Sequence, residues 1–360
     1  MAHRARNIVV AFLAALFLVG CQVSEYEYTT AKHLAPVPQA LKRKMATLDM
    51  EERAPILIRI FKQEDALEVW KKNRSGQFAL LATYEICAWS GDIGPKLKEG
   101  DRQAPEGFYT IHPYQMNPNS SYHLAFNLGF PNAYDRSHGR TGSHLMVHGD
   151  CSSRGCYAME DEQIEIIYAL ARDSFLGGQR AFQVQAFPFR MTPENLARYH
   201  DHKWIGFWKM LKEGYDHFEV TRREPKVDVC GRRYVFNAEP RSGTFSATAE
   251  CPIFDVPQDI WVQVASKQKE DEARMLQIVA ARQRREETEK EWEARRAMVA
   301  GFFGGEGGMS QRADQDADAA NSIVAAVRPS DGTAARPALP VRGGDDAAPR
   351  VMVPARPDTA

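Results

Sequence analysis

The sequence has no excess of charge of either sign. It holds 46 Lys and Arg residues against 47 Asp and Glu residues, a formal net charge of −1. Nucleic-acid-binding surfaces are rich in basic residues, so this balance gives no reason to expect a DNA or RNA partner. The sequence also lacks an internal repeat, a phosphate-binding glycine loop of recognised form, and a His/Cys set with convincing zinc spacing. We therefore expect neither a metal ion nor another cofactor.

A hydrophobic run of membrane-spanning length is also missing at the N-terminus. Ile8 to Val19 contains no charged residue and follows Arg4 and Arg6. The run is too short for a typical spanning helix of about 20 residues. A short basic region followed by a short apolar core is typical of a signal peptide, which predicts export.

The end of this run resembles a bacterial lipobox, with Leu-Val-Gly-Cys at residues 18–21. In such signals the cysteine is lipidated and becomes the new N-terminus, so Cys21 is the predicted anchor. Gln22 rather than Asp follows it, which in the enteric sorting pattern indicates the outer membrane. We expect a periplasmic protein anchored by lipid at the inner leaflet of that membrane. The alternative is an ordinary cleaved signal with an incidental cysteine.

Cysteine is scarce, with six residues in the chain. Without Cys21, five remain for an oxidising compartment, which permits two disulfides and one free thiol. Cys230 and Cys251 are the preferred structural pair. A thiol kept free after export is a candidate nucleophile, although any of the five could be buried and reduced.

The patterning predicts a mainly β catalytic region that carries one clear helix. Pro55–Phe61 alternates as a strand, and 121–127 and 143–148 are two of the further strands. Helical spacing follows at 160–175, and Thr192-Pro193 starts a helix to about Leu211. Residues 267–296 contain 17 charged residues, which indicates a solvated helix. The expected organisation is signal peptide 1–20, tether 21–50, catalytic domain 51–188, α+β appendage 189–265, charged helix 266–300 and disordered tail 301–360.

One stretch carries residues suited to covalent chemistry. A predicted strand ends at His148, and Cys156 follows in a loop just before a helix. A cysteine attacks as thiolate, and a histidine can take its proton and later return one to a leaving amine. Gly155 lets a substrate approach and leaves backbone N–H groups for an oxyanion. Spacing alone fits equally a structural histidine and a half-cystine. Cys151 is the rival nucleophile, but no glycine precedes it.

The pattern His-Gly followed by Ser-x-Gly-Cys resembles the signature of YkuD-type L,D-transpeptidases. Neighbouring segments are similar to the YafK-like branch of that family, and the likeness covers about residues 50–265. The segments that carry it are 86–96, 105–109, 117–122 and 130–135.

The resemblance implies a YkuD-like β-sandwich or barrel that acts on peptidoglycan stem peptides containing meso-diaminopimelate. It implies Cys156 as nucleophile, His148 as base and a thioester intermediate. An amine acceptor would give transpeptidation and water would give hydrolysis. One type of branch member is an amidase that detaches a lipoprotein from diaminopimelate, so a wall-linked lipoprotein is a further expected partner.

The sequence departs from the wider family beside the cysteine. Many members have histidine directly before the Gly-Cys pair, where this chain has Arg154. Many have arginine two residues after the cysteine, where this chain has Ala158. Arg154 and Arg140 are therefore the candidates for binding a substrate carboxylate, because a guanidinium suits it. The other candidate substrate-binding residues are Ser153, Tyr134 and His138.

Two other functions stay open. The first is a non-catalytic peptidoglycan-binding lipoprotein that uses the charged helix and tail as a scaffold. The second is a thiol-disulfide protein that uses Cys151 and Cys156, which predicts a reversible bond between them. An intact His148/Cys156 pair favours the enzyme.

Overall fold

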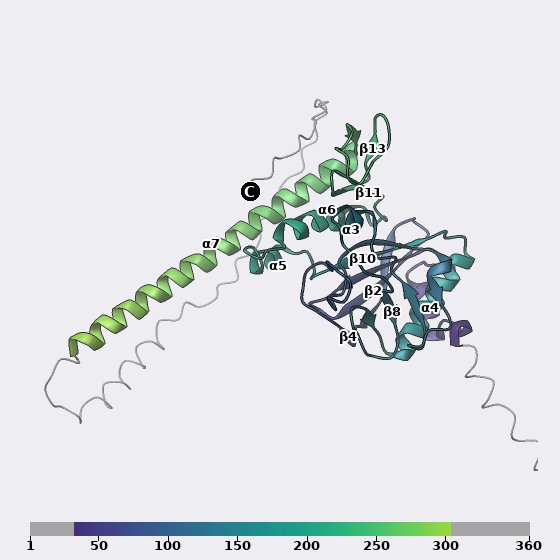
Figure 1. Ribbon diagram of the computed structural model, residues 1–360, viewed down its shortest axis with the longest axis horizontal. Coiled ribbons are helices and arrows are strands. Elements are labelled where there is room, and N and C mark those ends of the chain that lie inside the picture. Colours follow the sequence, from purple (N-terminus) through teal and green to yellow (C-terminus); the bar gives the residue numbers. More distant parts are fainter. Residues whose placement is uncertain (1–31, 304–360) are drawn as a thin grey trace, which may run out of the picture. The chain divides into compact units, whose positions relative to one another are not determined.

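The computed structural model describes residues 32–303 (Figure 1). The described residues up to Glu289 belong to one compact unit, and those from Lys290 to Phe303 belong to a second. The predicted signal peptide, the lipidation site at Cys21 and most of the predicted tail lie outside the described residues. Among the helices between residues 32 and 303, none has the length and apolar character that crossing a bilayer requires.

The first sheet has five strands in the order β3-β2-β1-β10-β5. Strand β1 pairs in parallel with β10 and antiparallel with β2, and it is the strand predicted from the alternation at 55–61. Every residue of β1 and β10 is buried, so both are central strands with covered faces. The strands are β1 (Ile56–Phe61), β2 (Ala66–Lys72), β3 (Phe78–Glu85), β5 (Gly107–Ile111) and β10 (Phe182–Phe187).

The two faces of β1 belong to different cores, because side chains alternate along a strand. Ile56, Ile58 and Ile60 lie in the core that also contains residues of α4 (Asp161–Leu176). On the other face, the buried guanidinium of Arg59 donates to Glu219 at 2.6 Å and lies 4.2 Å from the Tyr215 ring centroid. Both partners come from α6 (Ile205–Thr221), so a paired charge joins this helix to the sheet.

The second sheet also has five strands, in the order β4-β9-β8-β7-β6. The strands predicted at 121–127 and 143–148 are longer than the observed ones. His123 and His144 have φ values of 61° and 56°, and this left-handed backbone interrupts an extended strand. The strands are β4 (Ala88–Trp89), β6 (Met116–Asn117), β7 (Ala125–Asn127), β8 (Met146–His148) and β9 (Tyr157–Ala158).

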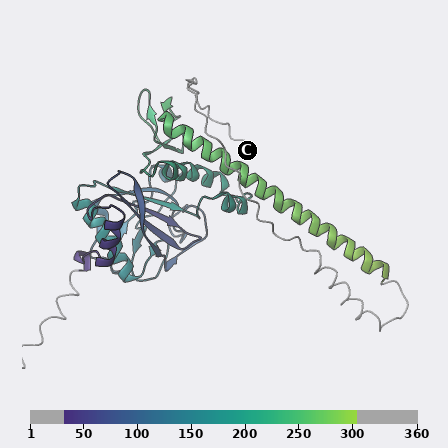
Figure 2. The same ribbon diagram turned by 180° about the vertical axis from the view of Figure 1, so that it is seen from behind.

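Helix α4 follows the cysteine motif, as predicted, and its apolar face is buried in the first core. Helix α2 (Gln39–Thr47) and the 3-10 turn η1 (Lys32–Leu34) lie beside it (Figure 2). Arg172 of α4 donates to the carbonyl of His33 at 2.9 Å, which ties the N-terminal segment to the helix. The short element η2 (Pro113–Gln115) links β5 of the first sheet to β6 of the second, and α3 (Ala133–Ser137) lies between β7 and β8 of the second sheet.

The single helix predicted from Thr192 to Leu211 is wrong, because the structure has two helices there, α5 (Pro193–Arg198) and α6. Thr192 caps α5 as predicted, accepting from the backbone of Asn195. The chain then turns at Tyr199, whose ring stacks on Phe189 with centroids 5.0 Å apart. Tertiary packing of aromatic rings, rather than a local breaker, therefore ends the helix.

Short strands follow α6, as expected for an α+β appendage: β11 (Val227–Cys230), β12 (Arg233–Phe236), β13 (Glu239–Pro240) and β14 (Phe254–Asp255). They pair in sequence order, β11 with β12 and β13 with β14. One hydrophobic cluster contains Phe61 and Phe187 of the first sheet together with Trp208 and Phe236 of the appendage. The appendage thus packs directly on the sheet.

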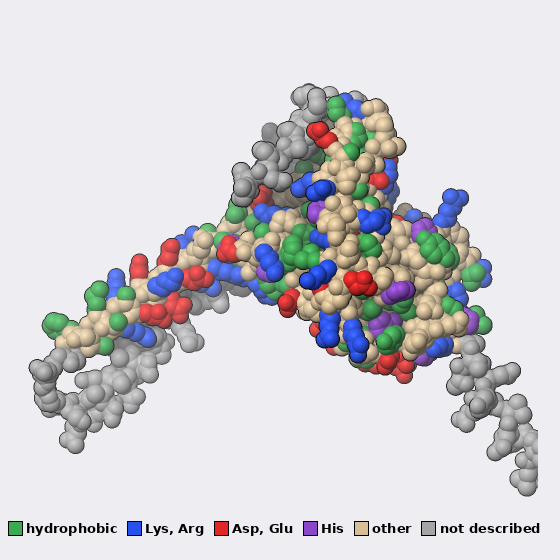
Figure 3. Space-filling model, in the orientation of Figure 1, with side chains coloured by type: hydrophobic (Ala, Val, Ile, Leu, Met, Phe, Trp, Pro, Cys, Tyr) green, Lys and Arg blue, Asp and Glu red, His purple; other side chains and the backbone are tan. Residues whose placement is uncertain are grey.

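The charged helix, α7 (Gln258–Phe303), is longer than the predicted 266–300. Its first part joins the appendage, because Met275 is buried in the same cluster and Lys212 of α6 donates to Asp271 at 2.6 Å. Residues 282–302 are exposed. Side chains of both charge signs line the helix (Figure 3). This pattern agrees with the predicted solvated helix.

Candidate active site

Strands β8 and β9 bring the predicted base and nucleophile onto neighbouring segments. The strands pair in parallel, with His148 opposite Ala158. Cys156 directly precedes β9, in the loop that leads into this strand. The backbone N–H of Met146, two residues before His148, donates to Cys156 Sγ at 3.4 Å. The predicted strand-to-loop arrangement is thus present.

His148 is 4% exposed, and its ring is held in one orientation. Its Nδ1–H donates to the carbonyl of Gly149 at 2.5 Å, which leaves Nε2 with the free lone pair when the ring is neutral. The ring of Tyr122 covers it with centroids 4.8 Å apart. Burial lowers the pKa of His148, and the Gly149 carbonyl and the charge of Asp150 offset part of this effect. The neutral, proton-accepting form is therefore favoured.

Cys156 is the free cysteine among the described residues. Its Sγ receives the Met146 N–H and lies 3.6 Å from the carbonyl of His144, to which the thiol donates. Burial raises the pKa of the Cys156 thiol, and the Met146 N–H and the charge of Lys96 offset part of the rise. Within residues 32–303, no hydrogen bond joins Sγ to the His148 ring. The directions of the two pKa shifts favour a neutral thiol and a neutral imidazole.

Ser153 organises the loop that presents the cysteine. Its hydroxyl donates to the Cys156 carbonyl at 2.8 Å and accepts the N–H groups of Gly155 and Cys156 at 3.2 and 3.1 Å. These are the two N–H groups expected to hold an oxyanion, so the Ser153 hydroxyl occupies that position in this structure. Gly155 has φ 126°, a conformation that other residues rarely adopt. The glycine is therefore required by the backbone.

The segment 90–104 forms a wall beside this loop. Ser90 Oγ lies 3.4 Å from Ser153 Oγ and donates to the carbonyl of Arg102 at 2.7 Å. A Cβ on Gly155 would lie 3.6 Å from the carbonyl oxygen of Gln103. The cysteine loop and the wall are thus in van der Waals and hydrogen-bond contact.

Two disulfides bridge the other described cysteines. Cys230 pairs with Cys251, as predicted, and Cys87 pairs with Cys151. Two bridges and one free thiol confirm the cysteine arithmetic. Because Cys151 is bonded to Cys87 rather than to Cys156, the thiol-disulfide hypothesis is wrong for this state of the protein.

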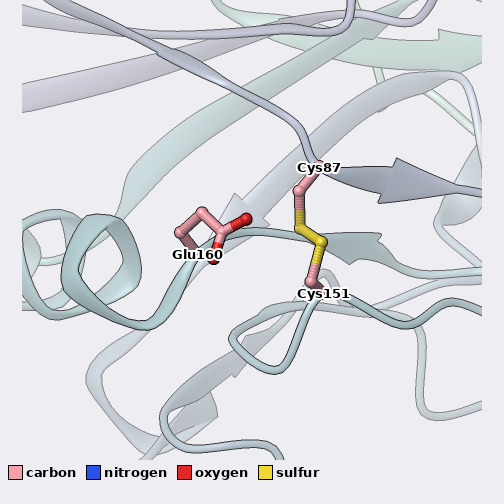
Figure 4. A group of neighbouring side chains, drawn as sticks. All are labelled: Cys87, Cys151 and Glu160. Atoms are coloured by element: carbon pink, nitrogen blue, oxygen red, sulfur yellow. A yellow bond between two sulfur atoms is a disulfide. The ribbon is translucent and has the colours of Figure 1, made fainter.

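The Cys87–Cys151 bridge lies in the loop between His148 and Cys156 (Figure 4). It fixes this loop to the segment before β4, where the Cys87 N–H also donates to the Ala158 carbonyl at 3.0 Å. Glu160 is close by, and its carboxylate and the two sulfurs lie within 4.8 Å of one another. With the sulfurs bonded to each other, the group lacks the thiolates that a metal ion would need.

Comparison with known proteins decides the family. The profile of the YkuD L,D-transpeptidase catalytic domain matches residues 56–185. Over 226 residues the chain is 41% identical to YafK of Escherichia coli, whose name assigns it provisionally to the L,D-transpeptidases. That match covers 63% of this chain and 89% of YafK. The chain belongs to the YkuD family of L,D-transpeptidases.

Solved structures of similar proteins include a variant of the helical cell shape determining protein Pgp2 from Campylobacter jejuni. It matches with a TM-score of 0.32 at 18% identity, covering 52% of this chain and 64% of that one. Bd1075 of Bdellovibrio bacteriovorus matches with a TM-score of 0.26 at 20% identity, covering 46% and 60%. Each match spans less than two thirds of the solved chain.

In this L,D-transpeptidase family member, the predicted substrate-binding residue Arg140 is buried in an ion pair. Arg140 is 7% exposed and donates to Asp135 at 2.8 Å, with its guanidinium 4.9 Å from the Tyr134 ring centroid. Tyr134 is also buried, stacked on Tyr234 at 4.5 Å. Because Asp135 already pairs with this guanidinium, a substrate carboxylate would have to displace a buried ion pair, while Arg140 Nε has no hydrogen-bond partner within the described residues.

Two other predicted binding residues, His138 and Arg154, are exposed, unlike Arg140. His138 is exposed, and its ring lies 4.3 Å from that of Tyr134. Arg154 is exposed, and no ion pair within residues 32–303 engages its side chain. Arg154 directly precedes Gly155 and Cys156, so among the predicted arginines it is the one whose position leaves it able to meet a substrate carboxylate beside the thiol.

Lys96 is a residue at the site that the sequence analysis did not select. It is 3% exposed, and its Nζ donates to Asp101 at 2.5 Å and to the carbonyl of Lys98 at 3.1 Å. The sequence offers one signal, a lysine between Pro95 and Leu97 with an aspartate five residues later. Nothing in that pattern shows that the side chain is buried.

A second missed group supports the loop after His148. His123 Nε2 lies 2.6 Å from Glu165, and its Nδ1 lies 3.4 Å from Asp161. Asp161 accepts the backbone N–H of Asp150 at 2.8 Å. A Cβ on Gly149 would lie 2.5 Å from the Asp161 carboxylate, so only glycine fits there. These contacts fix the carbonyl that orients His148.

Proposed function

We propose that this chain is a cysteine acyltransferase acting on peptidoglycan stem peptides that contain meso-diaminopimelate, with Cys156 as nucleophile and His148 as base. The observation that carries the proposal is the unbridged thiol of Cys156, the free cysteine among the described residues, in the loop entering β9, the strand that pairs with the one carrying the oriented His148. Membership of the YkuD family and the 41% identity to YafK support the reaction class.

The first half of the reaction makes a thioester. Nε2 of His148 accepts the proton of the Cys156 thiol, and the sulfur attacks the acyl carbon of the scissile amide. The carbon–nitrogen bond then breaks, and the imidazolium returns the proton to the leaving amine. The contact of Nδ1–H with the Gly149 carbonyl keeps the ring in the tautomer that this requires. Side-chain movement closes the distance between the two groups on substrate binding, as free enzymes often show long catalytic contacts.

In the second half an acceptor attacks the thioester. An amine acceptor forms a new amide and gives transpeptidation, whereas water gives hydrolysis, and in both cases His148 removes a proton from the attacking group. The Cys156 thiol is regenerated, so the cycle consumes no redox equivalent. An amidase that releases a protein from diaminopimelate would use the same two steps with a different leaving amine.

The tetrahedral intermediate needs donors for its oxyanion. The N–H groups of Gly155 and Cys156 serve this purpose once the intermediate displaces the Ser153 hydroxyl from them. Ser153 thereby fills the empty site with a neutral acceptor that a charged oxygen can replace, because hydrogen bonds to charged groups are the stronger ones. Arg154 meets the free carboxylate of diaminopimelate at the entrance.

The proposed location follows from the N-terminal residues. Export and lipidation at Cys21 would hold the catalytic unit at the inner leaflet of the outer membrane, facing the peptidoglycan. Two bridges and one free thiol suit an oxidising compartment. Labelled fatty acid incorporated into the wild type but not into Cys21→Ala would test the anchor.

Mass spectrometry of muropeptides, after incubation of the purified protein with sacculi, tests the proposed function. New 3–3 cross-links indicate transpeptidation, and released stems or protein fragments indicate an amidase. Cys156→Ala is expected to abolish either product. Ser152→Ala, a change at an exposed residue of the same loop, is the matched control and keeps activity. Undiminished processing by a folded Cys156→Ala variant would contradict the proposal and favour a non-catalytic scaffold.

A further inference from the structure

Lys96 is a buried cation held in a defined place. Its ammonium donates to Asp101 at 2.5 Å, and Asp101 in turn accepts the backbone N–H groups of Leu97, Lys98 and Gln103 at 2.9 to 3.0 Å. Burial acts to raise the pKa of Asp101, but the hydrogen bonds from Lys96 and the backbone outweigh it and lower that pKa. The aspartate is thus ionised and anchors the lysine.

The backbone segment 142–146 lies in contact with both Lys96 and Cys156. A Cβ on Gly142 would lie 2.7 Å from Lys96 Cε and 3.7 Å from its Nζ. Two residues further along, the carbonyl of His144 meets Cys156 Sγ, and the Met146 N–H follows it. The ammonium of Lys96 therefore lies beside the backbone segment that contacts the sulfur of Cys156.

Among the described charged groups near the thiol, Lys96 is the buried cation. His148 lies on β8, where burial favours its neutral form. Arg154 on the cysteine loop and Arg102 on the wall are exposed to water, which screens their charge. His144 is also exposed, and Asp101 is the acidic side chain in contact with Lys96. A buried charge acts across a lower dielectric and is therefore felt more strongly.

We propose that Lys96 is a positioning residue of the active site, held by Asp101 so that its buried positive charge favours the thiolate form of Cys156. The inference rests on the proposed function of Cys156 as a nucleophile. Lys96 forms no bond with the substrate and takes no proton in the cycle. The proton of the thiol goes to His148 or to water, and Lys96 stabilises the negative sulfur that remains.

The test measures the reactivity of the thiol and uses no peptidoglycan. The full-length protein is treated with iodoacetamide over a range of pH, and the alkylated Cys156 peptide is quantified by mass spectrometry, which separates it from Cys21. Below the midpoint of the profile, the rate follows the fraction of thiolate. Lys96→Met is expected to move the midpoint upward by about one pH unit, which slows alkylation about tenfold at a fixed lower pH.

Two further variants separate charge from structure. Lys96→Arg keeps a cation and is expected to restore most of the wild-type profile. Lys98→Met removes an exposed charge two residues away and is expected to leave the midpoint unchanged. An unchanged midpoint in folded Lys96→Met would overturn the proposal and leave Lys96 a structural partner of Asp101. If both position-96 variants fail to fold, Asp101→Asn decides the question.

Asp101→Asn keeps Lys96 but removes the carboxylate that holds its ammonium in place and keeps it charged, so the proposal expects slower alkylation below the midpoint, as in Lys96→Met. Unchanged or faster alkylation in this variant would overturn it. The outcome is independent of the proposed reaction, because a wild-type protein inactive on sacculi would still report the thiol profile. Failure of the muropeptide assay and failure of the alkylation assay therefore have different meanings.

Discussion

The pair formed by Lys62 and Glu106 connects the wall of the active site to the appendage. Both side chains are fully buried, with Lys62 Nζ 3.0 Å from Glu106 Oε1. Lys62 also donates to the Gly94 carbonyl at 2.9 Å, and Glu106 accepts the N–H of Gly94 and the indole N–H of Trp208. Burial lowers the pKa of Lys62 despite the nearby carboxylate. Lys62 therefore depends on Glu106 to stay charged.

Lys62→Met leaves the Glu106 carboxylate buried without its cation. We expect the free energy of unfolding to fall by about 3–5 kcal/mol, the usual cost of removing one partner from a buried pair. The matched control is Lys44→Met on α2, an exposed lysine whose loss is expected to cost less than about 0.5 kcal/mol. Urea unfolding followed by tryptophan fluorescence measures both, because Trp208 lies in contact with the pair.

The double variant Lys62→Met/Glu106→Gln tests whether the two residues act as a unit. Its loss of stability should be smaller than the sum of the single losses by about 1–3 kcal/mol, since the second change removes the stranded charge. Single effects that add within about 0.5 kcal/mol would refute the reasoning. So would a Lys62→Met variant as stable as the control.

Three other outcomes are expected. In the pH profile of kcat/KM, the acid limb reports His148 and lies below pH 6.5, because burial lowers the pKa of this histidine. The alkaline limb reports Cys156 and lies above the ordinary pKa range of a cysteine, because burial raises the pKa of this thiol. An acid limb above pH 7 would contradict this expectation. Gly149→Ala has no space for its methyl group against α4 and should lower the urea midpoint and activity together. Replacing Cys87 and Cys151 with alanine should cost about 4 kcal/mol, from the entropy of a loop with a separation of 64 residues, and calorimetry showing no loss would contradict it.

Sequence reasoning succeeded where local pattern or simple counting controls the outcome. The alternation at 55–61 predicted β1, Thr192-Pro193 predicted the start of α5, and five cysteines predicted two bridges with one free thiol. Each of these features depends on a few neighbouring residues or on whether the number of cysteines is odd or even. The His148/Cys156 motif was found through its resemblance to a family, because spacing alone did not separate it from a structural pair.

The features that sequence reasoning missed depend on partners far away in the chain. The chain turns at Tyr199 because the Tyr199 ring packs on Phe189. The position of Arg140 depends on its burial against the rings of Tyr134 and Phe207. Lys96 looks like a surface lysine in the sequence, but its side chain is buried in the fold. Positive φ angles at His123 and His144 shortened two strands. Histidine adopts such angles more often than most residues do, but its presence alone does not mark where they occur.

The position of Cys151 has a consequence for the way the protein matures. If the chain is exported as proposed, Cys87 emerges before Cys151, and Cys156 follows five residues after Cys151. Oxidation in order of emergence joins the first two and leaves the third without a neighbour to capture it. A chain that paired Cys87 with Cys156 would reach the same number of bridges but lack the free thiol that the proposed reaction needs, so the yield of protein with this thiol would depend on the order in which the cysteines are oxidised.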